Sequence, residues 1–231
     1  MSQRRIVFSV LVICLAVSAC ARLGGNSRSV RVAPVTYVAL GDSTGIGLGA
    51  RNGLGYVERL MARIQQTRPG SRLINLSTVG ATTTDVLSNQ LSRYPDASPS
   101  LITLSVGAND LMRGSDEQQF ARDYEKLVLR LKELRTPVVL TNLPDISLAP
   151  GLPESMHKQM RDRVPLFNNR IEDIAKRHEL QLVDLYGMSR DLIPSHPEFF
   201  SSDGIHPSDE GYKFWADKMW PAVSEAMGEL E

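Results

Sequence analysis

The chain has little of what marks several common protein classes. Only two of its 231 residues are cysteines, and one of them, Cys14, lies in an apolar run near the start. No disulfide framework is expected, and no cysteine–histidine cluster suggests a metal site. Basic and acidic residues balance at 26 each, so the charge gives no reason to expect a nucleic acid partner. We expect neither a metal nor a cofactor.

The apolar run near the start is short. Residues 6–17 are about a dozen mostly apolar residues, whereas a membrane-spanning helix takes roughly 20. Arg4 and Arg5 precede the run, and Ser18-Ala19-Cys20 follow it. A basic start, an apolar middle and small residues at the end are typical of a secretory signal. We therefore predict that the protein is exported and that residues 1–19 are its signal peptide.

The segment Val17-Ser18-Ala19-Cys20 resembles the lipobox of bacterial lipoproteins. The resemblance implies that Cys20 is lipidated and becomes the mature N-terminus, which anchors the protein in a membrane, facing the periplasm or the cell exterior. Residues 20–33 are then the lipidated cysteine and a flexible tether of small and polar residues. The alternative is an ordinary secretory signal with an incidental cysteine, which would release a soluble secreted protein.

From residue 34 onward, short β-branched runs alternate with longer amphipathic segments. Five strands separated by helices predict a parallel sheet covered on both faces, because right-handed crossovers place helices on each side. We expect one such domain over 34–231. Segment 143–165, which contains several prolines, has no clear assignment. The expected strands are 35–40, 72–76, 101–106, 137–141 and 181–185, and the expected helices are 55–66, 83–91, 120–134, 167–178 and 209–227.

The residues that follow the predicted strands suggest an acyl-transfer site. Ligands of such sheets bind beyond the carboxyl ends of the strands, and Ser43 follows the first strand. A serine becomes a nucleophile when an imidazole takes its proton and a carboxylate holds that imidazole. Asp203 and His206 have a spacing that allows this pairing. The backbone N–H groups of Ser43 and Gly80 and the side-chain amide of Asn109 could stabilise the oxyanion.

Four blocks occur in the order that is typical of the SGNH (GDSL-like) hydrolase family. They are Gly41-Asp42-Ser43, Gly80, Gly107-x-Asn109-Asp110 and Asp203-x-x-His206. The resemblance implies a flavodoxin-like three-layer α/β/α sandwich with Ser43 as nucleophile, His206 as base and Asp203 as its partner. It places Ser43, Gly80 and Asn109 in the oxyanion hole. Thr44 stands where the family motif has leucine, which puts the shape of the pocket in doubt more than the chemistry.

The family resemblance implies hydrolysis of a small-molecule carboxylic ester through an acyl-Ser43 intermediate. Lysophospholipases, thioesterases, arylesterases and carbohydrate deacetylases share these blocks. The apolar segment 145–153 is either the lining of an acyl groove or a structural loop. We expect a lipid-like or small acyl ester, with a carbohydrate O-acetyl ester as the alternative. The rival from another class is a catalytically silent surface module that binds lipid or glycan.

Other interpretations of the same residues explain less. Residues 45–50 fit a loose dinucleotide-binding pattern, but the acid expected after the second strand is replaced by 75–77, Asn-Leu-Ser. Residues 41–45 also fit the nucleophile elbow of α/β-hydrolases, but in that fold several strands precede the serine, whereas Ser43 follows the first predicted strand. His206 could be a surface histidine at the start of a helix. We interpret Asp42 and Asp110 as turn and hydrogen-bonding residues, and Trp215 and Trp220 as core or interface residues. The other histidines, His157, His178 and His196, are interpreted as surface or structural.

Overall fold

The computed structural model describes residues 33–51, 53–95 and 99–228, and their framework is a five-stranded parallel sheet. The strand order is β2-β1-β3-β4-β5, so β1 lies between β2 and β3. The strands are β1 (Thr36–Gly41), β2 (Arg72–Asn75), β3 (Leu101–Ser105), β4 (Val138–Thr141) and β5 (Gln181–Val183). The predicted signal peptide, Cys20 and nearly all of the tether lie outside the described residues.

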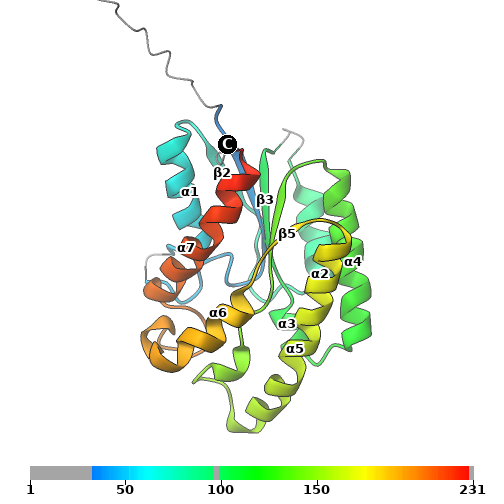
Figure 1. The fold of residues 1–231 in the computed structure, drawn as a ribbon, viewed down its shortest axis with the longest axis vertical. Coiled ribbons are helices and arrows are strands. Elements are labelled where there is room, and N and C mark those ends of the chain that lie inside the picture. Colours follow the sequence, from blue (N-terminus) through cyan, green and yellow to red (C-terminus); the bar gives the residue numbers. More distant parts are fainter. Residues whose placement is uncertain (1–32, 52, 96–98, 229–231) are drawn as a thin grey trace, which may run out of the picture. The chain divides into compact units, whose positions relative to one another are not determined.

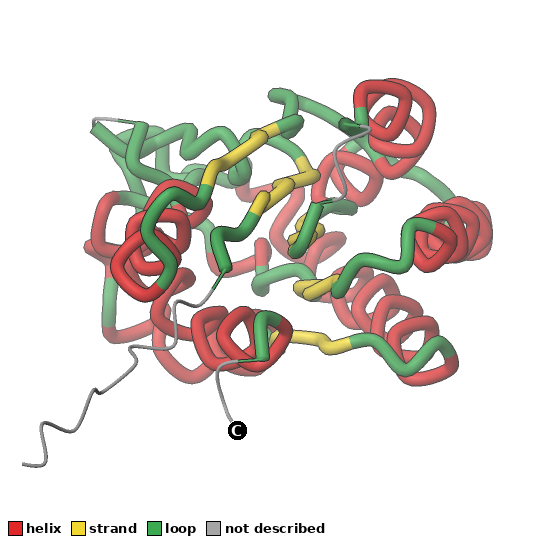
Figure 2. The backbone as a smooth tube through the Cα atoms, turned by 90° about the horizontal axis from the view of Figure 1, so that it is seen from above, coloured by secondary structure: helices red, strands yellow, loops and turns green. Residues whose placement is uncertain are grey.

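Helices cover both faces of the sheet, as Figures 1 and 2 show. One face packs against α1 (Tyr56–Thr67) and α7 (Asp209–Ala226), and the other against α4 (Glu117–Glu133) and α5 (Glu154–Arg177). No helix within the described ranges has the length and apolar character needed to cross a membrane. The predicted three-layer α/β/α sandwich with five parallel strands is confirmed.

The alternation of side chains along β1 explains why the four residues at its centre, 37–40, are all apolar or aromatic. Tyr37 and Ala39 belong to the core beneath α1 and α7, whereas Val38 and Leu40 belong to the core beneath α4 and α5. All four are fully buried. A parallel strand that is covered on both faces gains from apolar residues at every position, not only at alternate ones. The same two-sided burial holds for β3.

Several elements differ from those predicted from the sequence. Segment 143–165 largely belongs to α5, which begins at Glu154 and contains Pro165. Residues 83–91 are a short helix, α2 (Thr83–Asp85), followed by a π-helical turn (Val86–Gln90) and a 3₁₀ turn (Leu91–Arg93). Two short helices were not predicted, α3 (Ala108–Met112) and α6 (Leu185–Leu192). The fifth strand ends early because the side chain of Asp184 caps α6 by accepting from Gly187 N.

Candidate active site

The end of β1 holds Ser43 in a fixed position. Gly41 packs so closely against the backbone of Ser105 that a Cβ at residue 41 would overlap the carbonyl oxygen. The buried side chain of Gln90 brackets the same glycine, because its Oε1 accepts from Gly41 N at 3.0 Å and its Nε2 donates to Gly41 O at 2.7 Å. The backbone immediately before the serine is therefore fixed by both a strand neighbour and a side chain.

Polar side chains also hold the loop that follows Ser43. Asp42 is buried, and its Oδ1 accepts from both Thr44 N and Thr44 Oγ1 at 2.9 Å. Burial raises the pKa of Asp42, and the bonds from Thr44 offset part of the rise. Asn75 donates to Gly45 O at 2.7 Å. Thr44, the departure from the family motif, thus uses its hydroxyl to hold Asp42 while its side chain lines the neighbouring pocket.

A continuous set of hydrogen bonds links Ser43 to Asp203 through His206. Ser43 Oγ lies 3.0 Å from His206 Nε2, and His206 Nδ1 lies 2.7 Å from Asp203 Oδ2. The other carboxylate oxygen accepts from Ile205 N at 2.8 Å, His206 N at 2.9 Å and Ser201 Oγ at 2.8 Å. Burial raises the pKa of Asp203, but these hydrogen bonds outweigh it and hold the pKa well below its usual range. An ionised Asp203 can only accept, so Nδ1 carries a proton and Nε2 of a neutral ring faces the serine as acceptor.

Asn109 borders the same pocket as Ser43 and His206. It lies on α3, directly after the end of β3, and its Nδ2 donates to Ala81 O at 3.0 Å. This bond uses one of the two amide hydrogens and orients the group. The second hydrogen is left for a ligand or for water.

Gly80 lies close to Asn109 but borders a different hollow. It is the third residue of a turn closed by Ala81 N donating to Thr78 O at 3.1 Å, and its φ of +75° is typical of glycine in a type II turn. A second hollow of about 260 Å³ contains Gly80 and Arg113 in its lining. The structure thus brings Ser43, Asn109 and His206 to one pocket. Gly80 directly precedes Ala81, whose carbonyl oxygen accepts from Asn109.

Three side chains of one segment hold the turn that contains Gly80. Besides the bond from Asn109, Asp110 Oδ2 accepts from Thr83 N at 2.9 Å and from Thr83 Oγ1 at 3.2 Å, and Arg113 Nη2 donates to Gly80 O at 2.8 Å. Burial raises the pKa of Asp110, and its bonds with Thr83 offset part of the rise. Sequence reasoning assigned Asp110 a hydrogen-bonding role and did not identify Arg113.

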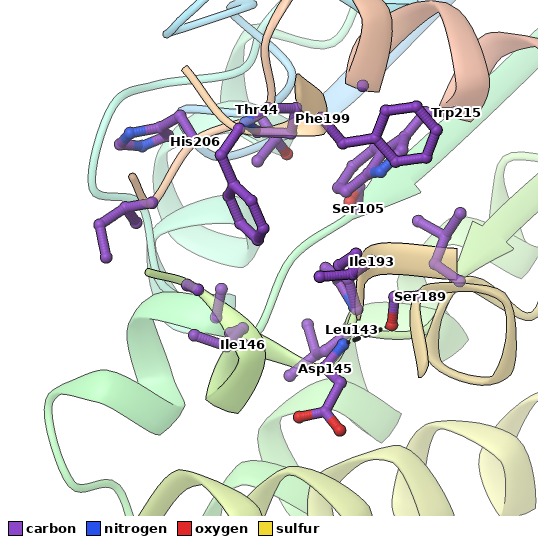
Figure 3. A pocket seen from close by; sticks show the side chains of 18 of the residues that line it. Thr44, Ser105, Leu143, Asp145, Ile146, Ser189, Ile193, Phe199, His206 and Trp215 are labelled. Carbon is purple, nitrogen blue, oxygen red and sulfur yellow. Dashed lines mark hydrogen bonds between the residues drawn. The ribbon is translucent and has the colours of Figure 1, made fainter. Parts of the chain in front are cut away.

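A pocket of about 240 Å³ extends from Ser43 and His206 between apolar walls. Figure 3 shows Phe199 and Trp215 facing Leu143 and Ile146 across it. Part of the segment considered for an acyl groove does line the pocket, whereas the contribution of α6 and of residues 192–200 was not anticipated. The remaining apolar lining residues are Ala108, Met112, Pro144, Ala149, Leu185, Leu192, Ile193, Phe200, Ile205, Pro207 and Phe214.

The other histidines and tryptophans lie in structural contacts. His157 Nδ1 lies 2.8 Å from Ser147 O, and His178 and His196 pair with glutamates. Trp215 is buried against Tyr56, as expected of a core residue, and also lines the pocket. Among the described residues, no group of three histidine, cysteine or acidic side chains could hold a metal ion.

Comparison with known proteins gives related enzymes at low sequence identity. The chain is 23% identical to an arylesterase of Vibrio mimicus over 142 residues, which are 60% of this chain and 64% of that protein. It therefore spans less than two thirds of that relative. It is 21% identical to the esterase TesA of Pseudomonas aeruginosa over 193 residues, covering 84% of this chain and 90% of TesA.

Solved structures share the fold. A crystal structure of TesA superposes with a TM-score of 0.68 at 20% identity, covering 83% of this chain and 99% of TesA. An acetyl xylan esterase, AlAXEase, gives a TM-score of 0.64 at 25% identity, covering 81% and 99%. The model of the GDSL-like lipase/acylhydrolase family matches residues 39–214, which include Ser43, Gly80, Asn109, Asp203 and His206. This chain belongs to the GDSL-like lipase/acylhydrolase family of ester hydrolases.

Proposed function

We propose that this protein hydrolyses carboxylic esters through an acyl intermediate on Ser43. The observation that carries the proposal is the continuous hydrogen bonding from Ser43 through His206 to Asp203. His206 Nε2 takes the hydroxyl proton while Oγ attacks the ester carbonyl, and Asp203 stabilises the resulting imidazolium. The ring then gives its proton to the departing alkoxide. A water molecule, deprotonated by the same nitrogen, releases the acid and restores the serine.

The oxyanion of the tetrahedral intermediate receives hydrogen bonds from three donors in this proposal. They are the backbone N–H groups of Ser43 and Gly80 and the free amide hydrogen of Asn109. The turn of Gly80 is held by bonds from Asn109 and Arg113, so two of these donors belong to one connected unit. Donors that are fixed before the reaction stabilise developing charge without a cost for reorganisation.

Substitution of Ser43 by alanine tests the proposed reaction. Purified S43A should lose hydrolysis of a short aryl ester by several orders of magnitude, because it retains only the oxyanion donors. In the wild-type protein, a fluorophosphonate should react with Ser43 much faster than with the exposed Ser92. Undiminished turnover by S43A would refute the mechanism, and a Ser43 no more reactive than Ser92 would favour a silent binding module.

The apolar pocket beside Ser43 supports a lipid-like or small acyl ester as substrate. Its walls are mostly aliphatic and aromatic, so it favours an acyl chain over a polar group. Carbohydrate O-acetyl esters are the alternative, which the likeness to an acetyl xylan esterase favours. Turnover of p-nitrophenyl esters from acetyl to palmitoyl distinguishes the two. We expect kcat/KM to rise beyond acetyl, whereas a strict preference for acetyl would exclude the acyl-chain proposal.

We also propose that the hydrolase domain of residues 34–231 is exported and anchored through a lipid on Cys20. The basic start, the apolar run of residues 6–17 and the lipobox-like Val17-Ser18-Ala19-Cys20 support this. Labelling with a radioactive fatty acid should mark the wild-type protein and not C20A, because a thiol is the attachment point. Equal labelling of both would exclude the lipid anchor and leave a soluble secreted protein as the alternative.

A further inference from the structure

Two glycines from distant parts of the chain meet backbone to backbone beside the acid–base pair. Gly151 N donates to Gly204 O at 2.9 Å. A Cβ at Gly151 would overlap Asp203 O and lie 2.9 Å from Gly204 C, and a Cβ at Gly204 would lie 2.6 Å from Gly151 N. These distances are shorter than any real Cβ contact, and the atoms met are backbone. The two segments therefore touch only because neither residue has a side chain.

Gly204 lies inside the turn that pairs Asp203 with His206. Asp203 accepts from the backbone N–H groups of Ile205 and His206, so its carboxylate and the imidazole are held by the backbone on either side of Gly204. Any shift of this backbone moves both partners of the 2.7 Å bond between Asp203 Oδ2 and His206 Nδ1.

Gly151 continues the wall of the apolar pocket. Ile146 and Ala149 line the pocket, and they are joined by Ala149 N donating to Ile146 O at 3.0 Å. Leu152 N in turn donates to Ala149 O at 3.0 Å, which closes a turn around Gly151. Consecutive tight turns thus connect the pocket wall to the contact with Gly204.

We propose that Gly151 is a positioning residue, through which the wall of the apolar pocket holds the Asp203–His206 turn in its productive geometry. The proposal rests on the function proposed above, since it concerns the same acid–base pair. A side chain at residue 151 would overlap the backbone of Asp203 and Gly204 and so displace the turn. In enzymes, a misplacement of about 1 Å costs about 10²-fold in rate.

The test is Gly151→Ala in the full-length protein. We expect kcat for a short aryl ester to fall about 10²-fold with KM changed less than threefold, because the pocket remains while the acid–base pair moves. Asp203 Oδ2 lies 2.7 Å from His206 Nδ1, so a displaced turn weakens the contact that stabilises the imidazolium formed during the reaction. An unchanged kcat would overturn the proposal.

Gly53→Ala is the matched control. Gly53 lies in a loop with a φ of +64°, and no atom lies within 4 Å of the position that a Cβ would take. The variant therefore adds the same methyl group and some backbone strain, but no new contact. It should keep the wild-type kcat and KM. Comparison with S43A separates this proposal from the function itself: an active S43A would refute the function, whereas an inactive S43A with an unimpaired G151A refutes only the role of Gly151.

A measurement on the wild-type protein covers the case that G151A does not fold. If the pocket wall and the turn form one unit, the amides of Gly151, Ile205 and His206 should exchange hydrogen with the same opening free energy. Exchange of Gly151 at least tenfold faster than that of both Ile205 and His206 would show that the contact opens independently and would overturn the proposal.

Discussion

At the scale of single residues, the two aspartates nearest Ser43 have opposite surroundings. Asp203 accepts four hydrogen bonds that hold its pKa below the usual range, so its carboxylate is ionised at neutral pH. Asp42 is enclosed, and burial raises its pKa. On acidification, Asp203 should therefore keep its charge at pH values at which an ordinary aspartate is already protonated.

Asp203→Asn tests the carboxylate. An asparagine amide can donate to Nδ1 and so favour the tautomer that presents N–H to the serine, for which triads lose about 10⁴-fold in kcat. We expect a loss of that order in aryl ester hydrolysis and a lower melting temperature, because a carboxylate whose pKa is depressed in the folded state stabilises that state while it is ionised. Asp191→Asn, on an exposed aspartate of α6, should leave kcat unchanged. A D203N enzyme within tenfold of wild type would assign the role of orienting the ring to another group.

Asn109→Ala tests the oxyanion donor. Removal of one such donor costs about 10²–10³ in kcat, while the ground state binds almost as before. We expect that loss in steady-state turnover, with a parallel decrease in the rate of fluorophosphonate labelling. Asn169 is exposed on α5, and N169A is the matched control. A rise in KM at constant kcat would instead show that Asn109 binds substrate without stabilising the transition state.

At the scale of elements, the pocket is built by segments that follow β4 and β5, while the nucleophile and the amide donor follow β1 and β3. Figure 3 places Ile193 beside Ser189 on the side of the pocket away from His206. These residues belong to α6 and to the 3₁₀ turn after it. In our proposal, the acyl chain therefore meets residues of α6 and the following 3₁₀ turn, which carry none of the reacting groups.

Ile193→Trp should shorten the acyl chain that the enzyme prefers. The larger side chain fills space on the side of the pocket away from His206, so we expect long chains to lose their site while acetyl and butyryl esters keep theirs. We expect kcat/KM for octanoyl esters to fall at least tenfold, with butyryl esters changed less than threefold. Ile193→Leu conserves volume and is the control. An equal loss at all chain lengths would place Ile193 outside the acyl site.

Features that depend on neighbouring residues in the sequence could be predicted, whereas features that depend on distant residues could not. The strands and the polar residues at their ends were predictable, because apolar runs and the residues that end them are local patterns. The start of α5 at Glu154 was not, since the prolines at 144, 150 and 153 suggested an irregular segment although they precede the helix. Gln90 and Arg113 bond to backbone groups distant in sequence, so no local pattern indicated their roles. The sequence likewise did not predict that Gly80 lines a second hollow rather than the pocket beside Ser43.

At the scale of the whole molecule, the burial of Asp110 should make stability depend on pH. Its pKa is raised in the folded state, so the folded protein binds this proton more tightly than the unfolded chain. The contribution of Asp110 to stability therefore rises as the pH falls from its folded-state pKa to its lower pKa in the unfolded chain. At neutral pH the carboxyl is ionised and lowers the stability of the fold.

Asp110→Asn removes that titration and retains an oxygen that can accept from Thr83. We expect the difference in unfolding free energy, D110N minus wild type, to be more favourable to the variant at pH 7 than at pH 4. Urea denaturation at both pH values measures it. A difference that is independent of pH would show that Asp110 titrates alike in both states. Asp116→Asn, on the exposed cap of α4, controls for the change of net charge.

The hydrogen bond between Ser43 and His206 joins residues 163 positions apart. The first strand and the segment before the last helix must both be in place before the serine meets its base. Until then Ser43 is an ordinary alcohol, no more reactive than any other serine in the chain. Catalytic competence therefore requires both distant parts of the chain to be in place, so the return of esterase activity after denaturation should report completion of the native topology rather than the collapse that precedes it.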